Sequence, residues 1–255
     1  MKAVKIKVKD LSKGYTGNVS HMALSNINLT ITEGEFVAVM GPSDSGKTTL
    51  WNMISTIDSP TSGSVFINSK NPYQLSVNDL ALFRRQELGF VFQSFNLLHT
   101  LTVRENMVLP LVLDGMNVKR INKRVESVSE KLGINEILNK RTYEISGGQA
   151  QETAIARALI HSPKLVLADE PTGKASQDVM EILTLLNKEK KATMMLVTHN
   201  PVAESYCDRI IFIKDGQLYN EVCYNDDRPL FYKNIMESLS MLGGNKHDFS
   251  TARIQ

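Results

Sequence analysis

The sequence predicts an α/β fold, and two observations support that prediction. Short, continuous apolar runs occupy residues 36–40, 165–168 and 194–197, as expected of parallel strands that are covered on both faces of a sheet. The first run leads into a glycine-rich turn. Apolar residues then recur at helical spacing, at Leu50, Met53, Ile54 and Ile57. The chain therefore has the order of strand, loop and helix that is typical of α/β proteins.

The N-terminal segment predicts a strand of a different kind. Val4, Ile6 and Val8 alternate with Lys5 and Lys7, which is the period of a strand with one face in solvent. We therefore expect the chain to begin with a half-exposed, antiparallel subdomain.

The segment between about residues 95 and 160 contains no comparable apolar run, so we expect a helical insertion there. Gly133 ends a stretch in which apolar residues recur at intervals of three and four. Glycine is common just past the end of a helix. The apolar positions of this predicted helix are Ile121, Val125, Val128 and Leu132.

A hairpin is predicted near the C-terminus, where Asp215 and Gly216 separate two apolar arms. The 255 residues are enough for one α/β domain with a sizeable core. We expect that domain to span residues 1–220 and a C-terminal extension to occupy residues 221–255.

Composition excludes several classes of protein. The formal net charge is only +2, so nothing global points to nucleic acid or to an anionic membrane surface. Cys207 and Cys223 fit neither a metal site nor a disulfide framework, and no targeting segment opens the chain. No run of about 18 apolar residues occurs. We expect a cytosolic protein that reaches a membrane only through a partner and does not bind nucleic acid.

The glycine-rich turn satisfies the pattern G-x-x-x-x-G-K-[ST] directly after a strand and before a helix. We expect backbone N–H groups and the helix N-terminus to bind phosphates, Lys47 to reach the β and γ phosphates, and the Thr48 hydroxyl to sit on Mg²⁺. A chance match has a probability of about one percent for ordinary glycine content, and the flanking elements lower it further. The predicted nucleotide-binding residues are Gly41, Pro42, Ser43, Asp44, Ser45, Gly46, Lys47, Thr48 and Thr49.

Two acidic residues, Asp169 and Glu170, directly follow the apolar run at residues 165–168. In an NTPase with such a phosphate loop, Asp169 would hold Mg²⁺ and Glu170 would orient or deprotonate the attacking water. The alternative is a pair of solvated acids at a strand end, and the phosphate loop favours the first interpretation.

The segment ISGGQ, Ile145–Gln149, lies between the phosphate loop and the acid pair. Together these motifs resemble the nucleotide-binding subunits of ABC transporters, whose signature is L-S-G-G-Q, and the resemblance runs from about residue 3 to about residue 220. It implies an ABC-type ATPase with a P-loop core. Tyr15 would stack on adenine, Gln93 would be the Q-loop glutamine that senses metal and permease, and His199 would be the switch histidine at the γ-phosphate.

The signature also has a local physical meaning. Ser146 and Gln149 form the pattern of a capping box, and the glycines between them leave the helix N-terminus bare. In the family this end faces the γ-phosphate bound by the opposite subunit, so the resemblance implies a homodimer that encloses ATP. The nucleotide contacts expected here are Ser146, Gly147, Gly148 and Gln149.

Three segments resemble the Bce-type transporters of bacitracin and peptide-antibiotic resistance more closely. They are residues 89–106, 197–217 and 241–244. This resemblance implies a transmembrane permease as partner and a place at the cytoplasmic face of the plasma membrane. The permease's cytoplasmic helix would bind near residues 93–96.

Asp44 departs from the family, which usually has glycine at this position. Aspartate tolerates φ > 0, so we expect the turn to form. Its charge would repel phosphate. We therefore expect the carboxylate to point outward and nucleotide to bind more weakly than with glycine.

Two further departures follow. About four residues, including the D-loop aspartate, are missing after Gly173, which threatens hydrolysis more than binding. Ser176 would cap the next helix, whose expected buried face is Val179, Ile182, Leu183 and Leu186. After the signature, Ala150 and Glu152 stand where relatives tend to carry arginine, and we expect Glu152 to lie in the first helical turn.

The sequence leaves several functions open. The chain could be the active ATPase of a peptide-antibiotic transporter, which the intact Glu170 and His199 favour. It could be a hydrolysis-impaired regulatory or scaffold subunit, which the three departures favour. It could also be the ATPase of a lipoprotein-release or cell-division complex. A non-transport ABC protein is less favoured, because the chain has neither a second nucleotide domain nor a long coiled coil.

Overall fold

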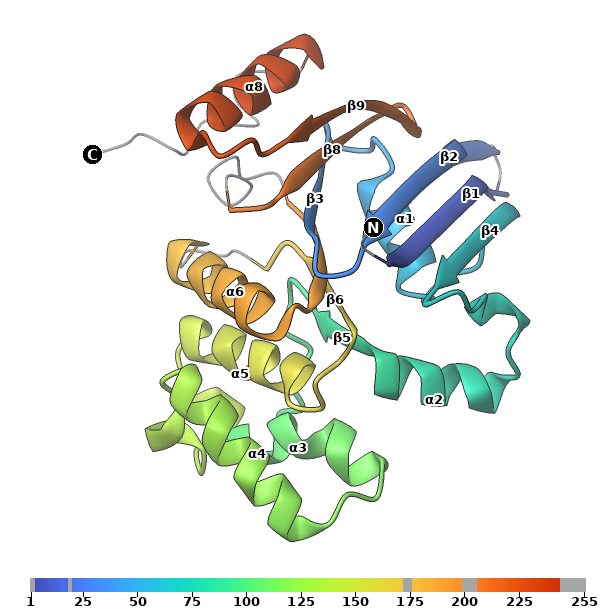
Figure 1. Cartoon of the computed structure of the whole chain (residues 1–255). Helices are drawn as coiled ribbons and strands as arrows, with labels where there is room; N and C mark the ends of the chain where they lie inside the picture. Colours follow the sequence, from blue (N-terminus) through green and yellow to red (C-terminus); the bar gives the residue numbers. More distant parts are fainter. Residues whose placement is uncertain (1–2, 18–19, 172–175, 199–205, 244–255) are drawn as a thin grey trace.

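The computed structural model describes residues 3–17, 20–171, 176–198 and 206–243. Two sheets and seven α-helices make up this part of the chain (Figure 1). Three short 3₁₀ turns complete it, at Pro72–Gln74, Asn135–Ile137 and Thr142–Glu144. The α/β fold with a P-loop core is confirmed.

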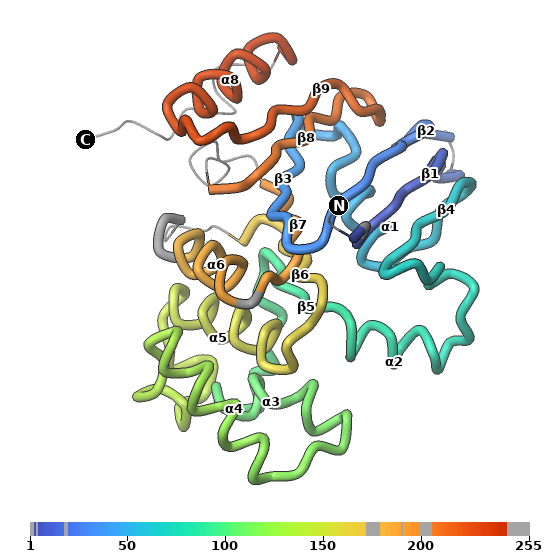
Figure 2. The backbone as a smooth tube through the Cα atoms, in the orientation of Figure 1, coloured from blue at the N-terminus to red at the C-terminus, as the bar shows by residue number. Residues whose placement is uncertain are grey.

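The larger sheet has the strand order β5-β6-β7-β3-β8-β9. Its first five strands are parallel, and β9 pairs antiparallel with β8 at the edge. Figure 2 shows β7 between β3 and β6. The strands are β3 (Phe36–Met40), β5 (Leu88–Val91), β6 (Leu165–Asp169), β7 (Thr193–Val197), β8 (Arg209–Lys214) and β9 (Gln217–Cys223). All three predicted apolar runs are therefore strands of this sheet.

Both faces of the larger sheet are buried, and β3 shows why its sequence is continuously apolar. Phe36, Ala38 and Met40 face one hydrophobic core, whereas Val37 and Val39 face the other. This alternation follows from the two-residue period of a strand. A strand between two cores has no position left for a polar residue.

The smaller sheet is antiparallel, as predicted, with the order β2-β1-β4. Its strands are β1 (Val4–Tyr15), β2 (His21–Thr32) and β4 (Ser62–Ile67). Ile6 and Val8 are buried and Lys7 is exposed. The expectation for Lys5 is wrong, because this residue is only 6% exposed. Its aliphatic stem is covered while its ammonium donates to Glu33 at 3.4 Å, as long basic side chains commonly do.

Helices cover the two faces of the larger sheet. Helices α3 to α6 and α8 contribute to one core, and α1 contributes to the core between the two sheets. The helices are α1 (Lys47–Ile54), α2 (Val77–Glu87), α3 (Val103–Leu113), α4 (Val118–Lys131), α5 (Gly147–Leu159), α6 (Ser176–Lys190) and α8 (Arg228–Met241). Helices α3, α4 and α5 gather at the end of the molecule opposite α8 (Figure 1).

Three predicted helices can be compared with the structure. Helix α4 buries its predicted apolar residues, and Gly133 follows it with φ 66°. Helix α6 buries Val179, Leu183 and Leu186, and Ile182 is partly buried. The Ser176 side chain lies outside the described atoms. Helix α1 is shorter than predicted: it ends at Ile54, Thr56 has φ 62°, and Ile57 is 50% exposed.

The C-terminal segment is integrated into the fold. Strands β8 and β9 form the predicted hairpin, with Asp215 and Gly216 at positive φ in its two-residue turn. Helix α8 lies along β9 (Figure 1) and buries Phe231, Ile235 and Leu239 in the main core. Among the helices of the described residues, none combines the length and the hydropathy that a membrane-spanning segment requires.

Candidate functional site: a phosphate-binding pocket

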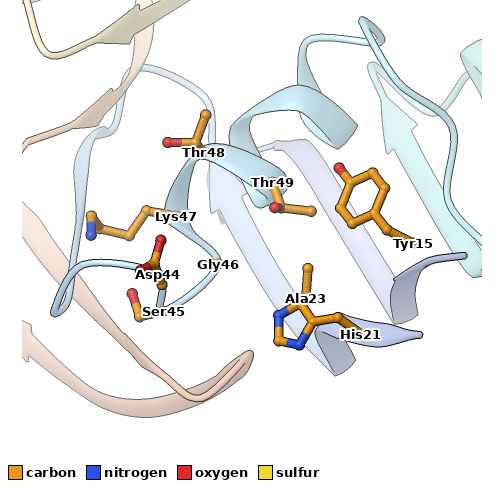
Figure 3. Close-up of a pocket in the computed structure, with 9 residues that line it drawn as sticks. All are labelled: Tyr15, His21, Ala23, Asp44, Ser45, Gly46, Lys47, Thr48 and Thr49. Carbon is orange, nitrogen blue, oxygen red and sulfur yellow. The ribbon is translucent and has the colours of Figure 1, made fainter. Parts of the chain in front are cut away.

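The loop between β3 and α1 borders a cavity of about 420 Å³. Residues of this loop and of the first turn of α1 form one side, and residues of β1 and β2 form the other (Figure 3). The lining residues are Tyr15, His21, Ala23, Asp44, Ser45, Gly46, Lys47, Thr48 and Thr49. The structure thus brings the predicted phosphate loop and the predicted aromatic residue to one cavity.

Gly46 can be replaced by no other residue without strain. Its φ is 102°, and a Cβ atom there would lie 2.5 Å from the carbonyl oxygen of Ala23. Gly46 is also the N-cap of α1, and no side chain of the described residues caps that helix end. The first amides of α1 therefore have no side-chain acceptor there, which suits them to an anion.

Lys47 points into the curl of the loop (Figure 3). Its ammonium donates to the carbonyl oxygens of Gly41 at 2.9 Å and Pro42 at 2.7 Å. Within the part of the chain that the structure describes, the Ser45 hydroxyl is buried without a hydrogen-bond partner. A cation, uncapped amides and an orphaned hydroxyl form a donor set that fits phosphate oxygens.

The C-terminal hairpin supports the loop from behind. The Gly216 amide donates to the carbonyl oxygen of Ser45 at 3.0 Å, and the Gly216 carbonyl accepts from the Ser25 amide at 2.8 Å. The turn of the hairpin is thus hydrogen-bonded to both the loop and β2. The shape of the phosphate loop depends on residues far from it in sequence.

Asp44 adopts φ 61°, the left-handed conformation expected for this position. It is solvent-exposed at the rim of the cavity, which it helps to line. The loop turn therefore forms without glycine at this position. The carboxylate remains part of the surface that a phosphate would meet.

The two acids lie at the same edge of the sheet as the loop. Asp169 ends β6, which is separated from β3 by β7 alone. Glu170 follows at φ 42°, and its amide donates to the carbonyl oxygen of Val197 at 2.7 Å. Gln93 Nε2 donates to Glu170 Oε2 at 3.1 Å. The structure therefore brings the predicted Q-loop glutamine into hydrogen-bond contact with the predicted catalytic carboxylate.

The pKa of Asp169 is raised above its ordinary value. Burial is the main cause, and the neighbouring charge of Glu170 adds to it. The charge of Lys47 acts in the opposite direction, which shows that the strand-end acid and the phosphate-loop lysine share one electrostatic environment. A buried carboxylate beside a second acid is a suitable ligand for a divalent cation.

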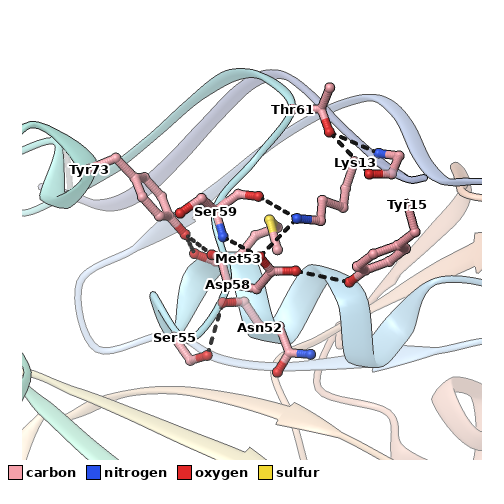
Figure 4. A network of polar contacts seen from close by, with 10 residues as sticks. Lys13, Tyr15, Asn52, Met53, Ser55, Asp58, Ser59, Thr61 and Tyr73 are labelled. Carbon is pink, nitrogen blue, oxygen red and sulfur yellow. Dashed lines mark hydrogen bonds and ion pairs between the residues drawn. The ribbon is translucent and has the colours of Figure 1, made fainter. Parts of the chain in front are cut away.

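Tyr15 is held in position by a polar network (Figure 4). Its hydroxyl donates to Asp58 Oδ2 at 3.1 Å, and Lys13 Nζ donates to Asp58 Oδ1 at 2.8 Å. Burial raises the pKa of Asp58, but hydrogen bonds from Lys13, the Ser59 amide and Tyr15 outweigh it and lower the pKa overall. Lys13 Nζ also lies 4.9 Å from the Tyr15 ring centroid, as in a cation–π contact. The ring is fixed and 43% exposed, so it offers a stacking surface to the cavity.

Four residues of this site were not predicted from the sequence. They are Lys13, His21, Ala23 and Asp58. The register of β1 and β2 pairs Tyr15 with His21, so a correct hairpin register would have placed His21 at the cavity. No local signal connects Asp58 with Tyr15, because 43 residues separate them.

The signature begins α5, as predicted. The Ser146 hydroxyl accepts from the Gln149 amide at 3.2 Å, and the Ser146 amide donates to the Gln149 side chain at 3.0 Å. A Cβ atom at Gly147 would meet nothing within 4 Å among the described atoms, so this helix end is open. None of the signature residues lines the cavity described above. Glu152 lies in the second turn and not the first, because α5 starts at Gly147.

Two predicted features lie outside the described residues. His199 is one, and the segment after Gly173 that would contain the shortened D-loop is the other.

Comparison with known proteins identifies the family of this chain. The family model described as "ABC transporter" matches residues 24–173. The ABC transporter ATP-binding protein YxdL of Bacillus subtilis is 54% identical over 253 residues, 98% of both chains. The bacitracin export ATP-binding protein BceA of Halalkalibacterium halodurans is 43% identical, covering 95% of this chain and 98% of the relative.

A solved structure also matches closely. It is the dimeric post-hydrolysis state of the ATP-binding cassette MJ0796, bound to ADP and Pi. The TM-score is 0.80 at 38% identity, and the match covers 87% of this chain and all of that one. The chain belongs to the ABC transporter family, as an ATP-binding subunit and an ABC-type ATPase.

Proposed function

We propose that this chain is the Mg²⁺-dependent ATPase of a bacterial transporter for export of, or resistance to, bacitracin-like peptide antibiotics. The supporting observation is the extent of two alignments. BceA aligns with 95% of this chain. The lipoprotein-releasing protein LolD 1 of Rhodopseudomonas palustris aligns with only 84% of this chain, although the alignment covers 97% of LolD 1. We assign the difference to an extension at residues 221–255 that follows a nucleotide-binding domain at residues 1–220. A peptide-antibiotic cargo is therefore favoured over lipoprotein release.

The site residues suit hydrolysis of a triphosphate. The loop amides and Lys47 would hold the phosphates, and Tyr15 would carry the adenine ring. Thr48 and Asp169 would bind Mg²⁺, which neutralises phosphate charge during transfer. Glu170 would orient the attacking water, and the hydrogen bond from Gln93 would fix the Glu170 carboxylate. His199 would contact the γ-phosphate, as the family resemblance implies.

A homodimer would complete each site. The capping box leaves the amides of Gly147 and Gly148 at an open helix end, and such an end attracts anions. We propose that Ser146, Gly147, Gly148 and Gln149 contact the nucleotide held by a second copy. The neighbour MJ0796 is dimeric.

A transmembrane permease would bind at a groove next to the Gln93 loop, and this would place the chain at the cytoplasmic face of the plasma membrane. The groove has a volume of about 480 Å³, and it is lined by residues of α2, β5, α3 and α5 together with Phe92, Asn96 and His161. Leu113 on its rim is 65% exposed. The groove includes part of the segment at residues 93–96 where the sequence predicts contact with a cytoplasmic helix.

The decisive experiment measures phosphate release by the chain purified with its neighbouring permease, beside Glu170→Gln. We expect the variant to lose about 10²-fold or more in turnover, because a positioned general base contributes about that much. Equal rates would support the hydrolysis-impaired scaffold instead.

Cargo is tested in a bacterium that lacks its own bacitracin transporter. Expression of the chain with its permease should raise the bacitracin concentration that the cells survive, and the Glu170→Gln pair should not. Unchanged sensitivity in both strains would contradict the proposed cargo.

A further inference from the structure

The groove beside the Gln93 loop combines an apolar surface with an excess of positive charge. The apolar lining residues are Ala81, Leu88, Phe90, Phe92, Leu109, Pro110, Leu113 and Ala158. Three arginines line it as well, Arg84, Arg85 and Arg157. No Asp or Glu is among the described residues that line it. A partner that fills this groove must therefore match both properties.

All three arginines are engaged within the chain. Arg84 Nε donates to the Thr56 hydroxyl at 2.8 Å, and its Nη2 donates to the Thr56 carbonyl oxygen. Arg85 Nε lies 3.5 Å from Asp114 Oδ1. Asp114 also accepts a hydrogen bond from Gln86 at 2.9 Å, so this nearby carboxylate is already shared.

Among the described residues, Arg157 resembles Arg84 in donating only to neutral groups, and it differs in that these groups lie at residues 95 and 96, beside Gln93. Its Nη1 donates to the carbonyl oxygen of Asn96 at 2.5 Å, and its Nη2 donates to that of Phe95 at 2.7 Å. Burial lowers the pKa of Arg157. Within the described residues, no carboxylate lies at ion-pair distance from it. A desolvated guanidinium whose charge meets only neutral carbonyls gains more than an exposed one from an incoming carboxylate.

His161 adds no charge to this surface. Its Nε2 lies 3.1 Å from the Leu88 carbonyl oxygen, and burial lowers the pKa of its imidazole. The imidazole is therefore neutral at pH 7. The positive potential of the groove comes from the arginines, and among the described residues only Arg85 of the three has a carboxylate at ion-pair distance.

We propose that the permease segment that binds this groove is a short amphipathic helix with a carboxylate among its apolar side chains, and that this carboxylate pairs with Arg157. The inference rests on the proposed permease partnership and specifies its chemistry. Apolar side chains of the segment cover Phe90, Phe92 and Leu113. Charge complementarity then selects one orientation of the helix in the groove.

Arg157 also connects the groove to the catalytic acid. Phe95 and Asn96, whose carbonyls it binds, both have positive φ, at 60° and 48°. They follow Gln93, whose side chain is bonded to Glu170. Arg157 is thus a positioning residue. A carboxylate that pairs with Arg157 alters its hydrogen bonds to the carbonyl oxygens of Phe95 and Asn96, and so alters the position of the segment that carries Gln93. Lysine has no planar fork and cannot bind both carbonyls in this way.

The test measures binding of each variant to the purified neighbouring permease in detergent. We expect Arg157→Gln to bind at least ten-fold more weakly than the unaltered chain. Arg157→Lys, which keeps the charge, should bind within about three-fold but show reduced permease-stimulated ATPase. Arg120→Gln is the matched control, because Arg120 is exposed on α4 and does not line the groove. Thermal denaturation of each variant excludes loss of folding.

The carboxylate itself is identified by changing each Asp and Glu of the permease's cytoplasmic loops to Asn or Gln. One change should weaken binding of the unaltered chain and have no further effect on Arg157→Gln. Binding by Arg157→Gln that equals the Arg120→Gln control, or additive effects at every permease position, would overturn the inference. If the unaltered chain does not bind the permease, the proposed partnership fails instead.

Discussion

Asp44 gives the sharpest prediction, because it is a single charge at the rim of the phosphate cavity. Asp44→Asn removes that charge and keeps a residue that accepts φ 61°. Asp44→Gly removes the charge and also relieves the left-handed conformation, which costs roughly 1–2 kcal/mol in a non-glycine residue. Comparing the two variants separates electrostatics from backbone strain.

The magnitude follows from the size of the cavity. A phosphate in a cavity of about 420 Å³ lies on the order of 7 Å from the Asp44 carboxylate. Two unit charges at about 7 Å repel by about 0.6 kcal/mol at a dielectric constant of about 80, and by about 1.2 kcal/mol at a dielectric constant of about 40. Each unit of phosphate charge therefore changes Kd by roughly 3- to 8-fold. We expect Asp44→Asn to tighten binding of free ATP by at least that much, and of MgATP by less.

The assay is an equilibrium titration of nucleotide at low salt, repeated at about 0.5 M salt, where screening over a few ångströms removes most of the difference. Asp44→Gly should bind ATP at least as tightly as Asp44→Asn. Equal affinity of the unaltered chain and the Asp44→Asn variant at low salt would refute the electrostatic reasoning. A gain in affinity that only Asp44→Gly shows, and that persists at high salt, would assign the effect to the backbone.

Three further predictions concern the same site. Gly46→Ala should abolish nucleotide binding and lower Tm, because its Cβ atom meets the Ala23 carbonyl; unchanged binding in a titration would contradict the loop geometry. Tyr15→Ala should weaken ATP binding about 5- to 150-fold, since aromatic–base stacking contributes about 1–3 kcal/mol, whereas Tyr15→Phe keeps the ring and should lose less. Asp169→Asn should raise Tm of the protein without nucleotide at pH 7. The raised pKa of Asp169 means that the folded state binds the proton more tightly than the unfolded state does. The stability that this carboxyl group contributes is therefore present below its ordinary pKa of 3.8 and is lost as pH rises through the pKa of the folded state. The Tm difference should therefore vanish below pH 3.8, and a lower Tm for Asp169→Asn at pH 7 would contradict the assignment.

The parts of the fold that the sequence predicts correctly are those encoded by residues within one short segment of the chain. A parallel strand between two cores is apolar at every position, so the apolar run at residues 36–40 predicts a strand with the bounds that the structure has. The phosphate loop requires fixed residues at fixed spacing. Gly133 and the turn at Asp215 follow from backbone conformations that few residues adopt. In each case the sequence constraint and the structural feature occupy the same few residues.

The remaining features depend on contacts between distant residues. Lys5 is buried because a glutamate 28 residues away meets its ammonium. Helix α1 ends early although Ile57 continues its apolar spacing. The network behind Tyr15 joins the end of β1 to the loop at Asp58, and these two segments share no motif. Periodicity describes one element at a time and contains no information about such pairs.

The hydrogen bond from Gly216 to Ser45 has a consequence for biosynthesis. A chain that emerges from the ribosome completes its phosphate loop early, but the turn that supports this loop is synthesised 171 residues later. Nascent chains that stop short of the hairpin would thus expose an unsupported loop, and nucleotide would stabilise the protein only once translation is almost finished.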